Sequence, residues 1–197
     1  MEKPAITEYD IHPLLKSRWS PRAFSPQPIE PHELMSLFEA ARWSPSGGNK
    51  QPWGFVVVSA ADDRETHQAL VEALSGNNRN WAHRAPILVL SVATPDPQTG
   101  ALNRFAYYDV GQAVAHLTVQ AAALGLFVHQ MAGFDADKAR QLLKLPDGCE
   151  PMTLIAIGRY GDPADLPDTL REREFAARSR KPFAEFLFRE RWDAPLK

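Results

Sequence analysis

The longest helical pattern in the sequence, over residues 103–124, places the strongest constraint on the fold. Apolar side chains recur along it at helical spacing, and its middle is rich in alanine (QAVAHLTVQAAALG). A helix with such small side chains is expected to pack closely against other helices or a sheet. Gly125 follows where helices commonly end on glycine. The chain must therefore provide a layer that covers this helix.

Apolar runs elsewhere supply candidates for that layer. Strands are predicted at 53–59, 86–93, 126–131 and 152–158. Further helices are predicted at about 30–41, which has Pro31 in its first turn, at 62–75, and at 136–143, which Asp135 can cap. Because the helices and strands alternate irregularly, we expect one α+β domain over residues 1–197, with a central sheet wrapped by helices.

The last part of the chain forms a separate pattern. From Tyr160 onward the sequence is rich in charge and proline, and it closes with aromatic and apolar side chains, namely Phe183, Phe186, Leu187 and Phe188. We treat residues 170–197 as a C-terminal extension. The extension packs either across a partner subunit or on its own domain, and the sequence leaves both open.

Composition narrows the class of protein. Apolar residues make up 44% and charged residues 23%, which is typical of a soluble globular protein. The net charge of −2 argues against a broad nucleic-acid interface. Cys149 is the single cysteine, so no intrachain disulfide can form. The start does not resemble a signal peptide and no run of 18 apolar residues occurs, so we expect a cytoplasmic protein that binds neither membrane nor nucleic acid.

Several common catalytic motifs are missing from the sequence. There is no G-x-G-x-x-G, no P-loop, no G-x-S-x-G, no H-x-x-x-H and no C-x-x-C. Zinc hydrolysis, triad chemistry and phosphoryl transfer are therefore disfavoured, and we expect no metal site. A protein without evident acid or base groups often leaves the chemistry to a cofactor, so no side chain is assigned as catalytic.

Two compact basic clusters are candidates for phosphate binding. The first is Arg18-Trp19-Ser20-Pro21-Arg22, in which two arginines flank a hydroxyl group, and the second contains Arg178, Arg180 and Lys181. The alternative for each cluster is a solvated basic turn. Spacing alone favours that alternative.

Two segments could bring backbone close to a ligand. Residues 44–53 (SPSGGNKQPW) form a glycine-bearing loop between a helix and a strand, and Asn49 and Gln51 could direct amide groups to a heterocycle. Residues 130–135 (QMAGFD) lie where a strand meets a helix N-terminus, and Gly133 there permits close approach. An ordinary connecting loop and an ordinary helix cap are the alternatives.

Taken in order, these segments resemble the nitroreductase family of FMN enzymes. The matching stretches are KSRWSPRAF, ARWSPSGGNKQPWGFVVV, NNRNWAHRAPILVLSVA, GLFVHQMAGFD, LIAIGRYGD and RSRKPFAEF. The resemblance covers nearly the whole chain, from about Arg18 to Phe186, and SPSGGNKQPW is its most specific part.

The resemblance implies a single FMN-binding domain with a mixed, mainly antiparallel sheet, and a homodimer whose C-terminal extension packs on the partner. It places two FMN sites at the subunit interface. The implied phosphate and ribityl contacts are the Arg18, Trp19, Ser20 and Arg22 segment together with Arg178 and Arg180. The loop from the other subunit would contribute Pro45, Ser46, Asn49 and Gln51.

The ring of the flavin would be met by Asn77, with Asn80 as a neighbouring alternative, and by backbone N–H groups of Ala132 and Gly133 near flavin N5. Some members of the family carry a glutamate where this chain has Ala132. The resemblance therefore leaves the choice of acceptor open.

The implied activity is an oxidoreductase reaction in ping-pong order. NAD(P)H, as either NADH or NADPH, would give a hydride to flavin N5, and a nitroaromatic, a quinone or a similar electron-poor acceptor would then be reduced. Two alternatives remain: a flavin enzyme of the same fold with another task, such as heterocycle dehydrogenation, dehalogenation or flavin fragmentation, and an FMN-binding protein without catalysis.

Overall fold

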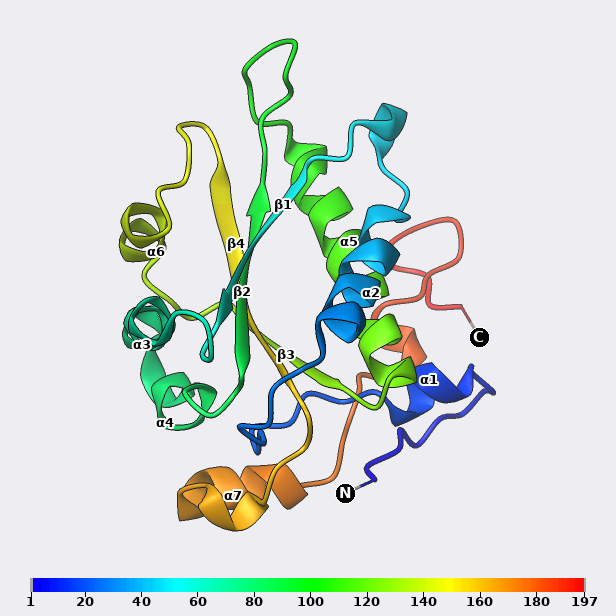
Figure 1. The fold of residues 1–197 in the computed structure, drawn as a ribbon. Helices are drawn as coiled ribbons and strands as arrows, with labels where there is room; N and C mark the ends of the chain where they lie inside the picture. Colours follow the sequence, from blue (N-terminus) through cyan, green and yellow to red (C-terminus); the bar gives the residue numbers. More distant parts are fainter. Residues whose placement is uncertain (1, 197) are drawn as a thin grey trace.

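A computed structural model describes residues 2–196 of the chain. Its centre is a four-stranded sheet in the order β1-β2-β4-β3, where β1 is Trp53–Ser59, β2 is Ile87–Ala93, β3 is Phe127–Met131 and β4 is Glu150–Gly158 (Figure 1). All three strand pairings are antiparallel. This agrees with the mainly antiparallel sheet that the resemblance implied, and no parallel pair occurs among the described residues.

Helices cover both faces of the sheet (Figure 1). Helices α2 (Pro31–Arg42) and α5 (Arg104–Ala123) lie on one face, and α3 (Arg64–Ala73), α4 (Arg79–Ala82) and α6 (Ala136–Leu142) lie on the other. Strand β2 is buried along its whole length, with Val89 facing the α2–α5 layer and Leu88 and Leu90 facing the opposite layer. Burial on both faces explains why β2 is a continuous apolar run.

The predicted elements are confirmed, with ends shifted by a few residues. Helix α5 is capped by Asn103, whose side chain accepts the Phe105 N–H, and Gly125 just after it adopts φ +69°. Helix α6 is capped by Asp135, as the sequence indicated. The α+β fold class is therefore confirmed.

Three short helices were not predicted: α1 (Pro13–Ser17), α4, and α7 (Asp168–Phe175). Helix α7 overlaps the start of the C-terminal extension, residues 170–197, for which no helix was predicted. Only Leu170 and Glu174 of α7 are buried, so it presents no apolar stripe that a periodicity argument could detect. Residues 2–196 also contain four 3₁₀ turns, at Gly47–Asn49, Gly76–Asn78, Pro163–Asp165 and Phe183–Glu185.

The two ends of the described chain lie on the same side of the molecule, next to α1 (Figure 1). Arg178 donates hydrogen bonds to the carbonyl oxygens of Lys3 and Lys16, at 2.7 and 3.1 Å. Tyr9 meets Phe183 edge to face, with the ring centroids 5.4 Å apart. The C-terminal extension therefore contacts its own subunit, while its predicted contact with a partner stays a prediction. No helix among the described residues is long and apolar enough to cross a membrane.

Candidate functional site

Three arginines that are far apart in the sequence meet in one pocket. Arg18, Arg178 and Arg180 line a cavity of about 240 Å³ between α1, the N-terminal segment and the start of the C-terminal extension. Burial lowers the pKa of Arg18, and the positive charges of Arg178 and Arg180 lower it further. No carboxylate of the described residues forms an ion pair with any of the three, whereas Arg84 and Arg159 pair with Asp165 and Glu33. A concentration of unpaired positive charge of this kind favours an anionic ligand.

Ser20 and Arg22 extend this cluster along the chain. Arg18 donates to the Ser20 hydroxyl at 3.4 Å, and Arg22 is partly buried without an ion pair among the described residues. Arg18, Arg178 and Arg180 therefore share one pocket, with Ser20 bonded to Arg18, and their role in binding a ligand stays a prediction.

A buried carboxylate fixes the backbone of this segment. Glu174 of α7 is fully buried, and its two oxygens accept the Arg22 N–H at 3.0 Å and the Ala23 N–H at 3.1 Å. Lys3 donates to the Glu174 carbonyl oxygen at 2.6 Å. Glu174 was missed by the sequence analysis because nothing near it in the sequence marks a carboxylate that bonds a segment 152 residues away.

His129 on β3 holds the same segment from the other side. Its Nδ1–H donates to the Pro21 carbonyl oxygen at 2.7 Å, and its ring lies against Trp81 with the centroids 4.5 Å apart. Because a carbonyl oxygen only accepts, the proton must be on Nδ1. Burial lowers the pKa of His129 to about 4, against the raising effect of the bond to Pro21, and nearby Arg22 lowers it further. The ring is therefore neutral at physiological pH.

Trp19 has a different role from the one its motif implied. Its side chain is buried and packs against Phe127 and Tyr160, with ring centroids 6.0 and 5.5 Å away. Burying this large apolar side chain is favourable in free energy, so the ring points toward the core. Arg18 and Ser20 on either side remain partly exposed. Its side chain therefore anchors the segment in the core, and a contact of Trp19 with a ligand stays a prediction.

The far end of β3 forms a second part of the candidate site. Ala132 and Gly133 follow β3 and are exposed, and the Gly133 carbonyl oxygen accepts the Ser75 N–H at 2.9 Å. A Cβ on Gly133 would lie 2.6 Å from the Ser75 hydroxyl and 3.9 Å from the Asn78 amide nitrogen. Asn77 and Asn80 are both exposed beside this contact, in the 3₁₀ turn and in α4. A side chain at position 133 would therefore displace the Ser75 hydroxyl.

Strand β3 connects these two parts. Phe127, at its start, contacts Trp19 next to Arg18, and Met131, at its end, precedes Ala132. Five residues in β conformation span about 17 Å, which suits an elongated ligand with a phosphate at one end and a ring at the other. β3 is also an edge strand, so no further strand of the described chain covers this side.

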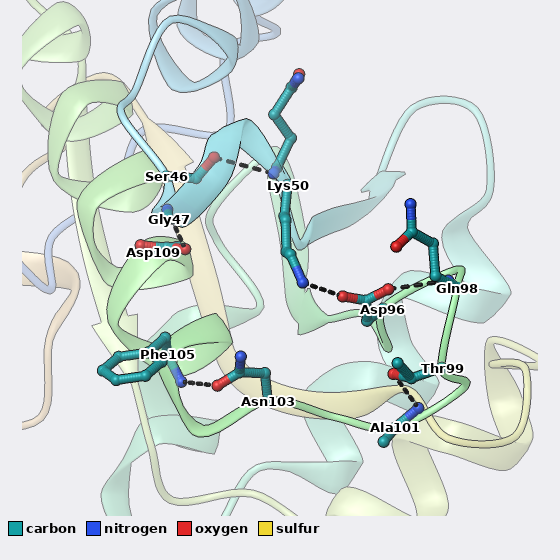
Figure 2. Close-up of polar contacts among 11 residues, drawn as sticks. Ser46, Gly47, Lys50, Asp96, Gln98, Thr99, Ala101, Asn103, Phe105 and Asp109 are labelled. Atoms are coloured by element: carbon teal, nitrogen blue, oxygen red, sulfur yellow. Dashed lines mark hydrogen bonds and ion pairs between the residues drawn. The ribbon is translucent and has the colours of Figure 1, made fainter.

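The Ser44–Trp53 loop is held on α5 by side-chain hydrogen bonds. The buried Asp109 carboxylate accepts the Gly47 N–H at 3.1 Å, and the buried Ser44 hydroxyl lies 2.6 Å from Nδ1 of His116. The Ser46 hydroxyl accepts the Gln51 N–H at 3.0 Å (Figure 2). The loop is therefore structured and is not a simple flexible connection.

Two predicted contact residues of the loop adopt unusual backbone conformations. Asn49 and Gln51 have φ of +55° and +50°, a region that is uncommon outside glycine and is found more often for asparagine. Pro45 and Asn49 are exposed, whereas the Gln51 amide donates back to the Asn49 carbonyl oxygen at 3.2 Å. Gln51 is thus partly engaged within the loop.

The loop and the arginine pocket lie at opposite ends of α5 (Figure 1). Gly47 is bonded to Asp109 near the start of the helix, while Arg18 shares a small cavity with Thr118 and Ala122 near its end. Asp109 and Ala122 are 13 positions apart, which corresponds to about 20 Å along the helix. One subunit therefore does not bring all the predicted contact residues together: the loop residues stand apart from the others.

The chain is similar to known proteins over most of its length. Residues 15–159 match the family model described as the nitroreductase family. An uncharacterized 15.4 kDa protein of Mycolicibacterium smegmatis is 36% identical over 139 residues, which cover 71% of this chain and 91% of that protein. A protein of Stenotrophomonas maltophilia named "Putative NADH dehydrogenase/NAD(P)H nitroreductase" is 27% identical over 184 residues, 82% of this chain and 90% of its own length.

Solved structures show the same fold. A crystal structure described as "the oxidoreductase containing FMN" matches with a TM-score of 0.88 and 35% identity, covering 96% of both chains. A nitroreductase family protein from Streptococcus pneumoniae matches with a TM-score of 0.72 at 20% identity, covering 90% of this chain and 98% of that one.

Proposed function

Because the chain belongs to the nitroreductase family, we propose that it is a homodimeric, FMN-dependent oxidoreductase that uses NAD(P)H to reduce electron-poor acceptors. Nitroaromatics and quinones are the acceptor classes that we assign to it. The observation that carries the proposal is the pocket of unpaired arginines beside β3. No carboxylate of the described chain neutralises the positive charge of these arginines, so that charge is available to a phosphate.

The residues of the pocket fit the phosphate of FMN. Arg18 and Arg180 would donate hydrogen bonds to the phosphate oxygens, and the Ser20 hydroxyl would donate one more. Arg178 already donates to two carbonyl oxygens through one of its nitrogens, so we assign it both to the phosphate and to holding the N-terminal segment in place. Arg22 and the main chain of Trp19 complete this end.

The ring end of FMN would lie against the segment after β3. Backbone of Ala132 and Gly133 would approach flavin N5, and an amide from residues 77–80 would meet the polar edge of the ring. The fit rests on Gly133, because a side chain there would meet Ser75 and also narrow the space for a ring.

The second subunit would provide the remaining contacts. A two-fold axis beside α5 would bring the loop with Pro45, Ser46, Asn49 and Gln51 of one chain to the arginine pocket of the other, because the two lie at opposite ends of that helix. The face of α5 that such a contact needs is open: Tyr108 is 69% exposed, and Gly111 and Ala115 on the same face are small. Small residues allow close helix approach.

The chemistry supplied by a bound FMN is hydride acceptance from NAD(P)H and electron delivery to the acceptor, in ping-pong order. The residues of this chain bind and orient: the arginines hold the phosphate, and the loop and β3 segments fix the ring and shield it from water. His129 is neutral and occupied with Pro21, so we do not assign it as an acid or base.

One purification tests the proposal. The absorbance spectrum of the purified protein should show bound flavin, and anaerobic addition of NADH or NADPH should bleach it, with recovery when 2-methyl-1,4-naphthoquinone is added. Protein that binds FMN but is not bleached by either nucleotide would instead be a non-catalytic FMN-binding protein. Bleaching without recovery by quinones or nitroarenes would point to another task on the same fold, and failure to bind FMN at all would refute the proposal.

A further inference from the structure

A second cavity is lined by none of the residues that we assign to the flavin. It has a volume of about 480 Å³ and is formed by three parts of the chain: the segment before α2, the turn from β1 into α3, and the residues between α4 and β2. Helices α3 and α4 lie beside the end of the sheet where β1 finishes and β2 begins (Figure 1). A ligand held here would occupy a site separate from that of FMN.

Prolines form much of the wall of this cavity. Pro26, Pro28 and Pro31 come from the segment before α2, and Pro86 directly precedes β2. Ile29 adds a buried apolar side chain between them. Proline rings are apolar, and the fixed φ of proline makes such a wall stiff. A stiff apolar wall with a few polar groups is typical of a site for a small organic molecule.

His67 is the buried polar group of the cavity. It is only 3% exposed and lines the cavity from α3. Its Nε2–H donates to the Ala85 carbonyl oxygen at 2.9 Å, and because a carbonyl oxygen only accepts, the proton is on Nε2. Burial lowers the pKa of His67, so the ring is neutral at physiological pH. Nδ1 is then an acceptor without a partner among residues 2–196, and a ligand in the cavity should bring a donor to it.

The charges that act on the His67 ring are positive. Arg64, the first residue of α3, and His83 also line the cavity, and both lower the pKa of His67 in addition to the effect of burial. Arg64 forms no ion pair within the part of the chain that the structure describes. A negative group on a ligand is therefore favoured beside Arg64.

The other charged side chains of the lining are less suited to a ligand. Arg84 pairs with Asp165 at 2.5 Å, so its charge is already neutralised. Asp62 is exposed and is the one carboxylate among the described lining residues. It opposes an anion, but it is not among the groups that shift the pKa of His67. Binding of an anion near His67 therefore depends on Arg64.

We propose that this cavity is a binding site for a planar aromatic carboxylate that also carries a hydroxyl group. The carboxylate binds Arg64, the hydroxyl donates to Nδ1 of His67, and the ring lies against the prolines. This site goes beyond the proposed oxidoreductase function and does not depend on it, since the two sites share no residue.

Three related probes test the assigned chemistry, namely 6-hydroxy-2-naphthoate, 2-naphthoate and 2-naphthol. The first carries both polar groups, the second lacks the hydroxyl and the third lacks the carboxylate. Their affinities are measured by isothermal titration calorimetry on protein saturated with FMN, so that the arginine pocket is filled. We expect 6-hydroxy-2-naphthoate to bind about tenfold more tightly than either of the others, because each of those leaves one partner of the site unpaired.

Two variants assign the binding to this cavity. Arg64→Gln should weaken 6-hydroxy-2-naphthoate about tenfold and leave 2-naphthol unchanged, because only the first probe carries the charge that Arg64 binds. His67→Gln keeps a side-chain N–H for the Ala85 carbonyl oxygen but removes the Nδ1 acceptor, so 6-hydroxy-2-naphthoate and 2-naphthoate should then bind equally. Arg104→Gln is the matched control, because Arg104 is also an exposed first residue of a helix and lies outside the cavity.

A measurement on the parent chain does not depend on how the variants fold. In nitrogen NMR of histidine-labelled protein, 6-hydroxy-2-naphthoate should shift the Nδ1 resonance of His67, whereas 2-naphthoate should leave it nearly unchanged. Equal affinities of the three probes, or 6-hydroxy-2-naphthoate binding that is the same in Arg64→Gln and Arg104→Gln, would refute the site. If the chain does not bind FMN, the Arg18→Ala/Arg180→Ala variant replaces the FMN-saturated protein, so failure of the proposed function leaves this test intact.

Discussion

Glu174 is a single residue on which the arginine segment depends. Its fully buried carboxylate is stabilised by two backbone N–H groups, and in return it fixes the backbone between Arg22 and Phe24. Removing an acceptor here would leave these N–H groups without a partner. Hydrogen bonds to a charged group contribute about 1.5–3 kcal/mol each, so the contact is strong relative to the stability of a typical domain.

We predict that Glu174→Ala lowers the free energy of unfolding by about 2–4 kcal/mol, as measured by urea denaturation, because two buried donors lose their acceptor. FMN affinity should fall as well, since the arginine segment is no longer held. Glu172→Gln on the same helix is exposed and is the control, with an expected change below about 0.5 kcal/mol. Equal stability of the Glu174 variant and its parent would contradict the assigned role.

His129 makes stability depend on pH. Its pKa is about 4 in the folded protein, against about 6.5 in an unfolded chain. Between these values the unfolded state binds a proton that the folded state does not. The contribution of the neutral His129 ring to the free energy of unfolding is thus fully present above pH 6.5 and is lost as the pH falls toward 4.

We therefore predict that the free energy of unfolding falls as the pH is lowered from about 6.5 to 4, by up to about 3 kcal/mol from this residue. His129→Gln should flatten that part of the profile, as followed by denaturation at a series of pH values. His67, whose pKa burial also lowers, remains in the variant and accounts for a residual slope of the same sign. A profile identical to that of the parent would show that His129 does not titrate in this way.

At the scale of elements, the arginine segment is attached to the end of β4. The Phe24 backbone forms a bridge with Tyr160, and Gly161 donates to the Ala23 carbonyl oxygen at 2.9 Å. A Cβ on Gly161 would lie 2.5 Å from the carbonyl carbon of Phe24, which is backbone and has little freedom to move. Glycine is needed here because two main-chain segments approach each other closely.

We predict that Gly161→Ala destabilises the fold by about 2–3 kcal/mol, since the new methyl group forces two backbone segments apart. Thermal or urea unfolding measures this directly, and FMN affinity should weaken in parallel because the arginine segment moves with Phe24. A loss of less than about 0.5 kcal/mol would mean that the close approach is not rigid.

The sequence predicted the main elements because they bury apolar side chains with a clear period. Helices α2 and α5 and the strands all present such patterns, whereas α7 buries a leucine and a glutamate and has none.

The grouping of Arg18 with Arg178 and Arg180 came from the family resemblance, since spacing alone cannot bring residues 160 apart together. Glu174 and His129 act over 152 and 108 residues, so their roles depend on tertiary packing that no local motif records. The polar motif around Trp19 did not indicate that its ring is buried.

For the whole molecule, the separation of the loop from the arginine pocket is the central feature. The two lie at opposite ends of α5 in one subunit, and the proposed function needs both at one flavin (Figure 1). A two-fold dimer resolves this, because each subunit would contribute its pocket to one site and its loop to the other. We therefore predict that no single chain can hold FMN tightly.

Complementation between two defective variants tests that claim most directly. Arg18→Ala/Arg180→Ala removes the charges of the pocket, and Ser46→Ala/Asn49→Gly removes loop contacts while glycine suits the positive φ at residue 49. We expect each homodimer to lose FMN affinity by about a hundredfold or more, from two lost polar contacts.

The two variants are then given different affinity tags, mixed under mild denaturation, refolded and purified as heterodimers. In the heterodimer one site carries both defects and the other carries none, so the account predicts about one tightly bound FMN per dimer, with parent-like affinity. FMN binding by the heterodimer that is no tighter than by either homodimer would contradict an interface site and would mean that each chain builds its site alone.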